Sequence, residues 1–201
     1  PDTGAATLAL PLKDIPQGSY FSALFPLRDG GFLVHSNSPD PAETRRGFAR
    51  VGRDGSRRYE PHIPAGADRG VSASGEPAVS QNERYAALVV GRRLKVWDAR
   101  TGEPLLTWAD DHYFATQPAF TRDRLAVRAA SDYYTLGSGG LPLRYQLFDV
   151  PSAAKLGEFR PQDAKLPTDV YAFSPNGKYL ALAGKAEVVV VDADVAFGLA
   201  K

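Results

Sequence analysis

The feature that most constrains the fold of this chain is an internal repeat. A short turn, an apolar segment, a second turn and another apolar segment that ends near Asp recur four times. Equivalent positions at Gly31, Arg84, Arg124 and Lys178 are separated by 53, 40 and 54 residues. Self-similarity at a period of this size is typical of architectures in which one small unit is stacked repeatedly. The two longer periods indicate insertions, at roughly 36–47 and 131–142.

The repeated units are predicted to consist of β-strands. The 19 Gly and 16 Pro residues are spread along the chain and separate short apolar runs rich in Val, Leu, Phe and Tyr. Such runs, bounded by turn residues, favour strands. Four strands in a unit of about 40 residues predict an all-β fold, a β-propeller of about four four-stranded blades. The predicted blades, in one domain of residues 1–201, are 20–63, 73–108, 114–159 and 169–192.

Two segments resemble WD-repeat β-propellers. Ser174–Ala181 is similar to the turn and strand signature of a WD blade, and Val96–Glu103 is similar to its third strand and exit turn. The chain departs from the family pattern, because no Gly-His pair opens a blade and only Trp97-Asp98 keeps the Trp-Asp pair. The resemblance implies a divergent WD-like propeller. The high content of Ala, Arg and Gly suggests a bacterial source.

The closure of the ring is open to two interpretations. Residues 7–14 are predicted to form a lone strand, which resembles the terminal strand that WD-like propellers lend to the last blade to close the ring. The chain could therefore be a closed four-bladed propeller. The alternative, which we favour, is part of a ring of about seven or eight blades that another chain or segment completes. The chain has no Met and begins with Pro1, so we expect a processed form or a segment of a longer protein.

The last predicted strand and the residues after it are less regular. Val188–Val191 are apolar at four successive positions, which predicts a strand covered on both faces by neighbouring blades. Residues 195–201 could form one helical turn or begin another strand.

Composition excludes several classes of function. The chain has no Cys, which excludes a disulfide framework, a thiolate metal site and a cysteine nucleophile. Its net charge of +1 gives no reason to expect a nucleic acid as partner. No run of 18 apolar residues occurs, so no transmembrane segment is predicted. The compartment stays open between an exported or periplasmic and a cytoplasmic location.

A protein partner is expected on the face of the propeller that carries the long loops. The strands of a blade are lettered a to d from the axis outward, so the a–b and c–d turns share one face and the b–c and d–a loops share the other. The a–b turns here are tight, as at Asn82-Glu83 and Asn176-Gly177, whereas several b–c and d–a loops are long. Long loops on a rigid scaffold often carry binding residues, although they can also be neutral insertions.

Two clusters on the loop-rich face are candidates for partner binding. Asp110, Asp111 and His112 could bind a cation or act as acid and base, or they could form a solvated turn. Tyr133 and Tyr134 precede a Gly-rich tip and offer contact area at low entropic cost, unless one of them packs back onto the blade.

Basic residues form a third candidate. Arg45 and Arg46 begin a segment with six Arg among residues 45–58. Nucleic-acid binding requires such charges on one surface, but successive strand residues point to opposite faces and acidic neighbours partly neutralise the run. A solvated outer strand that resists edge-to-edge aggregation is the simpler interpretation.

The sequence carries no signature of a known catalytic site. Gly-x-Ser-x-Gly, His-Glu-x-x-His and Walker motifs are absent, and no catalytic residue, metal or cofactor is predicted. Asp98, Asp149 and Asp192 recur at one position of the repeat, which is typical of turn caps. We predict a non-enzymatic interaction scaffold or an accessory subunit of a larger assembly. The alternative is an exported propeller enzyme or ligand-binding domain, hydrolase- or lactonase-like, with its site on the loop-rich face.

Overall fold

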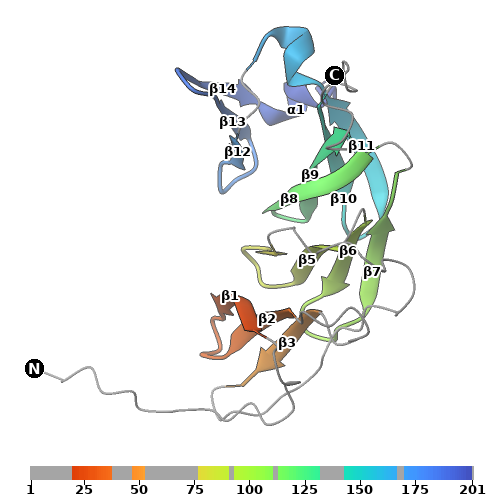
Figure 1. Cartoon of the computed structure of the whole chain (residues 1–201), viewed down its shortest axis with the longest axis vertical. Helices are drawn as coiled ribbons and strands as arrows, with labels where there is room; N and C mark the ends of the chain where they lie inside the picture. The colour runs from red at the N-terminus through yellow and green to blue at the C-terminus, as the bar shows by residue number, and fades with distance from the viewer. Residues whose placement is uncertain are drawn as a thin grey trace, which may run out of the picture. The chain divides into compact units, whose positions relative to one another are not determined.

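A computed structural model of the chain describes residues 20–37, 47–52, 77–90, 93–110, 113–131, 143–166 and 170–200 (Figure 1). The closing strand predicted at 7–14 lies outside these residues, as does the end of the first predicted blade. The elements are β1 (Tyr20–Pro26), β2 (Phe32–Asn37), β3 (Gly47–Val51), β4 (Ala78–Val79), β5 (Tyr85–Val90), β6 (Arg93–Asp98), β7 (Pro104–Trp108), β8 (Tyr113–Thr121), β9 (Arg124–Ser131), β10 (Arg144–Asp149), β11 (Ala154–Phe159), η2 (Pro161–Ala164), β12 (Val170–Phe173), β13 (Tyr179–Ala183), β14 (Val188–Asp192) and α1 (Ala193–Ala196).

The chain divides into two compact units, Pro1–Ile63 and Pro64–Lys201. In the first unit, β1, β2 and β3 form an antiparallel sheet in sequence order. Arg50 of β3 is buried, and its guanidinium donates to the Asp29 carboxylate at 2.5 Å, so the buried charge is paired. His35 is also buried, beside the Phe48 ring, and burial lowers the pKa of its imidazole to about 4. His35 is therefore a neutral structural residue near pH 7.

The described part of the second unit forms three antiparallel sheets. Strands β4–β7 form the first sheet, β8–β11 the second and β12–β14 the third, each a meander in which sequence neighbours pair. This topology follows from the sequence because each strand is five to nine residues long, apart from β4 and β12, and is bounded by turn residues. Each of the four sheets in the described residues has three or four strands, as the propeller prediction requires.

In two of the sheets, the same side-chain hydrogen bonds stabilise the turn between the first and second strands. In the turn between β4 and β5, the Asn82 side-chain oxygen accepts from the Ser80 hydroxyl at 2.7 Å and from the Arg84 N–H at 3.1 Å. In the turn between β12 and β13, the Asn176 oxygen accepts from the Ser174 hydroxyl at 2.8 Å and from the Lys178 N–H at 3.1 Å. The repeated sequence therefore produces the same local geometry.

Three Asp residues cap the turns that follow the third strand of a sheet, as the sequence predicts. The Asp98 carboxylate accepts from the Arg100 N–H at 2.8 Å. Asp149 accepts from the Ser152 N–H at 3.0 Å, and Asp192 accepts from Val195 at 3.2 Å at the start of α1. Each side chain satisfies a backbone donor that the ladder leaves open.

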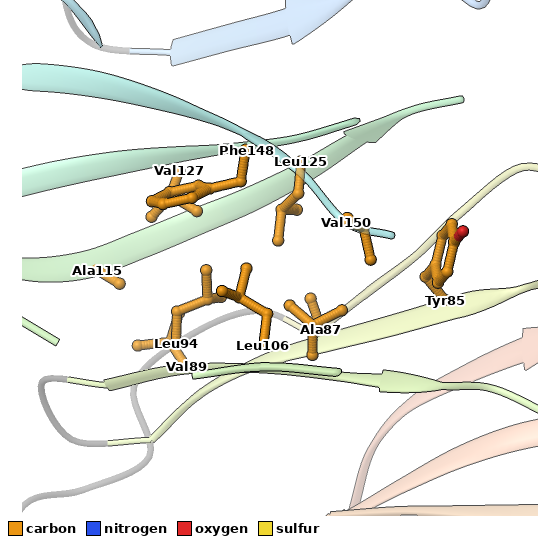
Figure 2. Packing of buried hydrophobic residues seen from close by; sticks show 11 residues of the cluster. Tyr85, Ala87, Val89, Leu94, Leu106, Ala115, Leu125, Val127, Phe148 and Val150 are labelled. Carbon is orange, nitrogen blue, oxygen red and sulfur yellow. The ribbon is translucent and has the colours of Figure 1, made fainter. Parts of the chain in front are cut away.

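The sheets β4–β7 and β8–β11 pack through one apolar cluster (Figure 2). Tyr85, Val89 and Leu94 of the first sheet face Leu125 and Phe148 of the second. These side chains alternate along their strands with residues that point the other way. Because apolar burial contributes about 25 cal/mol per Å², this cluster is a main source of cohesion between the two sheets.

A second cluster joins β8–β11 to β12–β14 and α1. Tyr145 and Leu147 of β10 pack against Leu180 and Leu182 of β13. The buried Tyr171 hydroxyl of β12 lies within hydrogen-bonding distance of the Gln117 carbonyl and, at 3.2 Å, of the Ala126 carbonyl. Its donated proton therefore ties the third sheet to the irregular step in the β8–β9 ladder.

The structure decides between alternatives for residues 195–201 and corrects the prediction made for Val188–Val191. Residues 193–196 form the helical turn α1, one of the two alternatives that the sequence left open. The prediction that Val188–Val191 are covered on both faces is wrong for the described residues, because Val188 and Val190 are exposed. The other face of β14 packs inward, where Val191 contacts the second cluster.

Candidate functional site

Of the residues proposed from the sequence as partner contacts, the structure describes only Asp110. Asp111, His112, Tyr133, Tyr134, Arg45 and Arg46 lie outside the described residues.

Asp110 belongs to an ion-pair network rather than to an open acid site. Its carboxylate pairs with the Arg144 guanidinium, which also lies 3.6 Å from the Glu158 carboxylate. Glu158 in turn accepts from Lys155 at 2.8 Å and from Arg160 at 3.0 Å. Burial alone would raise the pKa of Glu158, but hydrogen bonds from Lys155 and Arg160 outweigh it and lower the pKa to about 2. These contacts give both carboxylates a structural role, and they keep Glu158 ionised near pH 7.

The described residues contain no group of three His, Asp or Glu side chains that could hold a metal ion. In the same residues, no helix has the length and apolarity that crossing a membrane requires.

A pocket of about 500 Å³ lies at the tight-turn end of the second and third sheets. The lining residues come from the β8–β9 turn, the end of β10, the β12–β13 turn and α1: Thr121, Arg122, Asp123, Arg124, Asp149, Asn176, Gly177, Lys178 and Asp194. The pocket therefore lies among the short a–b turns, at the opposite end of the sheets from the long loops on which the sequence analysis placed its candidates.

The charges that line this pocket balance one another. Three of its residues are basic and three are acidic. The Arg124 guanidinium donates to Asp194 at 2.7 Å, and Asp149 is engaged in its own turn. Gly177 has a positive φ of +70°, and a Cβ there would lie 2.0 Å from the Thr121 hydroxyl oxygen. The arrangement is typical of a close contact between two turns, and it favours no ligand of one charge.

In the described residues, one face of the sheet β12–β14 leaves large apolar side chains exposed to solvent. Four of the six exposed large hydrophobic side chains in the described residues belong to this sheet. Their exposed fractions are 67% for Val188, 61% for Val190, 55% for Val170 and 42% for Tyr179. The pairing places these residues on one face, because Val170 and Val188 both pair with Ala183, and Val190 pairs with Ala181. These four residues, with Ala172, Ala181 and Ala183, are called the open face below.

An apolar surface of this kind is informative. Exposed apolar residues scattered singly are ordinary, whereas a contiguous patch on one sheet marks an interaction site. The sequence does hold a signal for it, since the run Val188–Val191 predicts a strand that is covered on both sides. Sequence reasoning missed the site because it assigned the cover to neighbouring blades and looked for partner contacts in the loops.

No protein-family model matches the chain, and no curated protein matches it. Solved structures do match. The β-propeller domain of Myceliophteria thermophila Cps50 (Swd1) is similar over 90% of this chain, with a TM-score of 0.56 and 12% identity. BamB from Moraxella catarrhalis is similar over 87%, with a TM-score of 0.52 and 15% identity. The computationally designed Ika4 protein is similar over 89%, with a TM-score of 0.56 and 12% identity.

These similarities define the fold. The chain has the fold of a divergent WD-like β-propeller, or part of one, as the sequence predicts. It spans about half the length of the natural proteins, 47% of the BamB chain and 54% of the Cps50 chain, and 94% of the Ika4 chain. Identities this low carry the fold alone.

Proposed function

We propose that this chain is a non-enzymatic component of a protein assembly, which binds another polypeptide through the open face of β12–β14. The observation that supports the proposal is the exposure of Val188, Val190, Val170 and Tyr179 on one side of one sheet. Water contact with these side chains is unfavourable by about 25 cal/mol per Å² of apolar area, so a partner that covers them gains stability.

The alternative of a hydrolase-like enzyme receives no support from the part of its predicted site that the structure describes. Asp110 would have to act as an acid, a base or a cation ligand. Its carboxylate is engaged in an ion pair with the Arg144 guanidinium instead.

The proposal is tested by affinity capture from an extract of the source organism. Three tagged proteins are compared: the wild type, the double variant Val188→Glu and Val190→Glu, and a control with Thr107→Glu and Ala154→Glu. The control positions are exposed and lie on β7 and β11, away from the open face. We expect one polypeptide to bind the wild type and the control equally and to be at least about 10-fold depleted with the valine variant.

The captured polypeptide is then purified and titrated into each protein by calorimetry. A saturable heat with the wild type that disappears with the valine variant supports the proposal. Capture that is the same for all three proteins, with the valine variant folded by circular dichroism, would show that the open face binds nothing and would overturn it.

A further inference from the structure

We propose that the side chains of Arg128 and Gln117, where the sheet β8–β11 meets β12–β14, form a binding site for a carboxylate group. Arg128 lies on β9 and Gln117 on β8. The site is on the covered side of β12–β14, where the second apolar cluster packs, and not on the open face. The inference therefore does not rest on the proposed function.

The first argument is that Arg128 occupies a position of the repeat that is apolar in the other two sheets of its unit. Arg128 of β9, Val89 of β5 and Ala183 of β13 are equivalent, because each lies four residues after the residue that pairs with the capping Asp of its sheet. Val89 is 1% exposed and belongs to the apolar cluster between β4–β7 and β8–β11. The fold accepts a small apolar side chain at this position, so packing gives no reason for a guanidinium there.

Arg128 also differs from the other Arg on the same face of β9, because it has no acidic partner. Arg124 lies four residues earlier, and its guanidinium donates to the Asp194 carboxylate at 2.7 Å. In the part of the chain that the structure describes, the half-buried Arg128 forms no ion pair, and its buried Nε has no hydrogen-bond partner. A partly desolvated cation without an anion is unfavourable, so the binding of an anion here stabilises the protein.

The described polar groups around Arg128 are neutral. The Gln117 side-chain oxygen accepts from Arg128 Nη1 at 3.5 Å, which is longer than an ordinary hydrogen bond. The Tyr171 hydroxyl donates its proton to backbone carbonyls, and burial raises the pKa of this phenol, so it carries no charge near pH 7. Within the described residues, Arg128 therefore faces dipoles and not a counter-charge.

Gln117 supplies a second donor beside the guanidinium. Its backbone has a φ of 46°, in the left-handed region, at the step where the β8–β9 ladder shifts register between Thr116 and Ala119. Irregular steps of this kind are frequent beside functional sites, because they change the direction of a side chain. Since the Gln117 oxygen is directed at Arg128, its amide nitrogen remains to donate, and it has no acceptor among the described residues.

A guanidinium beside an amide nitrogen matches the two oxygens of a carboxylate. Guanidinium groups bind carboxylates through parallel N–H···O bonds, which fix the orientation of the anion. Both side chains are half-buried, so each keeps surface that a ligand can reach. A single positive charge balances a carboxylate, whereas a phosphate dianion requires a second cation, and Arg144 on the next strand is engaged by Asp110 and Glu158. The carboxylate can belong to a small organic acid or to an acidic side chain of a polypeptide.

The inference is tested by NMR spectroscopy of the isotope-labelled chain, with the Nε–H signal of Arg128 as the readout. Sodium acetate is titrated at pH 7 and compared with sodium chloride at the same ionic strength. We expect acetate to shift the Arg128 signal saturably, with half-saturation on the order of 10 mM or below, and chloride to leave it in place. A signal that acetate does not shift, or that chloride shifts equally, would overturn the inference. Inorganic phosphate that saturates the site at a lower concentration than acetate would overturn the assignment to a carboxylate.

Two variants separate ligand binding from a structural role of the guanidinium. Arg128→Val introduces the residue type of the equivalent Val89, and it should abolish the acetate response of the neighbouring backbone N–H signals. Its urea midpoint should equal or exceed that of the wild type, because an unpaired cation is replaced by an apolar side chain. Arg124→Gln is the matched control and should keep the acetate response of Arg128. An Arg128→Val chain that unfolds at a lower urea concentration, or does not fold, would show that Arg128 is a structural residue and contradict the proposal.

The source of the carboxylate is assigned by two further probes on the wild-type chain, propionate and a capped peptide of four Ala residues around one Glu. Half-saturation at a concentration about 10-fold lower for the peptide than for propionate would support an acidic side chain of a polypeptide as the ligand. Equal values would support a small organic acid. The same peptide with Gln in place of Glu is the control. If it shifted the Arg128 signal as strongly as the Glu peptide, the site would not recognise the carboxylate and the inference would fail.

Discussion

The sheets β4–β7 and β12–β14 have the same turn, the same strand register and the same apolar face, yet only the first is covered. Tyr85 is buried and Tyr179 is 42% exposed, although both follow a turn closed by Ser and Asn side chains. Local sequence therefore determines which way a side chain points, whereas its burial is determined by the next sheet. The same apolar face is therefore covered in one sheet and exposed in the other, and this difference is the observation on which the proposed interaction rests.

Replacing the equivalent tyrosines should have the largest effect on this comparison. Tyr85→Ala removes a ring from the apolar cluster and should lower the free energy of unfolding by about 4 kcal/mol. Tyr179→Ala should cost less than about 1 kcal/mol at a protein concentration where the chain is monomeric. Urea denaturation followed by fluorescence measures both values. Equal losses would mean that the two faces are covered alike in solution.

A variant in the sheet β8–β11 gives a reference change in the free energy of unfolding, because Glu158 lies on neither of the two compared faces. Glu158→Gln removes the charge that accepts from Lys155 and Arg160 and should lower the free energy of unfolding by about 2 kcal/mol near pH 7. The folded pKa of about 2 lies below the ordinary 4.5, so this stabilisation is present above pH 4.5 and is lost as the pH falls toward 2. Denaturation of both proteins at pH 7 and pH 3 checks the sign. A gap that widens in acid would contradict the assignment.

The two turns differ in the residue at one left-handed position, and an alanine substitution in each turn tests the effect of that difference on stability. Gly177 and Glu83 occupy equivalent positions with φ of 70° and 58°. Gly177→Ala should cost about 2 kcal/mol, because the new Cβ meets the Thr121 hydroxyl and the backbone is left-handed. Glu83→Ala should change the free energy of unfolding by less than about 0.5 kcal/mol, since that site already holds a residue with a Cβ. Thermal unfolding of both variants compares them directly.

The Asn side chains in the two turns should show the smallest effects, and nearly equal ones, since the Asn82 side chain has only one additional bond, a 3.3 Å donation to the exposed Asp123 carboxylate. Asn82→Ala and Asn176→Ala each remove an acceptor from a backbone N–H and a Ser hydroxyl. Each should cost about 1 kcal/mol, because both turns are partly solvated. Chemical denaturation of the two variants side by side gives the values. Unequal losses would indicate that the cover over β4–β7 also stabilises its turn, so that the sheets differ in more than their faces.

Much of the fold could be predicted from the sequence because its determinants are local. Apolar runs between turn residues define the strands. The carboxylates of Asp98, Asp149 and Asp192 each accept a hydrogen bond from a backbone N–H three residues further along the chain. The candidate site depends on distant pairs instead. Arg144 holds Asp110 from 34 positions away, and no spacing rule connects the two residues.

The open face was beyond sequence reasoning for a different reason. The run Val188–Val191 correctly predicts an apolar strand. The sequence of a strand does not indicate which segment packs against it. In the described residues such a segment is present on one side only. A repeat with identical blades predicts identical packing, and β12–β14 departs from that prediction because only one of its faces is covered by another described sheet.

The Asp caps described above have a consequence for how such chains grow. Each cap closes the corner that leads out of a third strand, with hydrogen bonds that stay inside the same repeat. A copied repeat therefore brings its own corner with it, and a gene that duplicates or deletes one repeat need not rebuild the turn chemistry of the others. Blade number can change in single steps during evolution, while the bonds within each blade stay as they were.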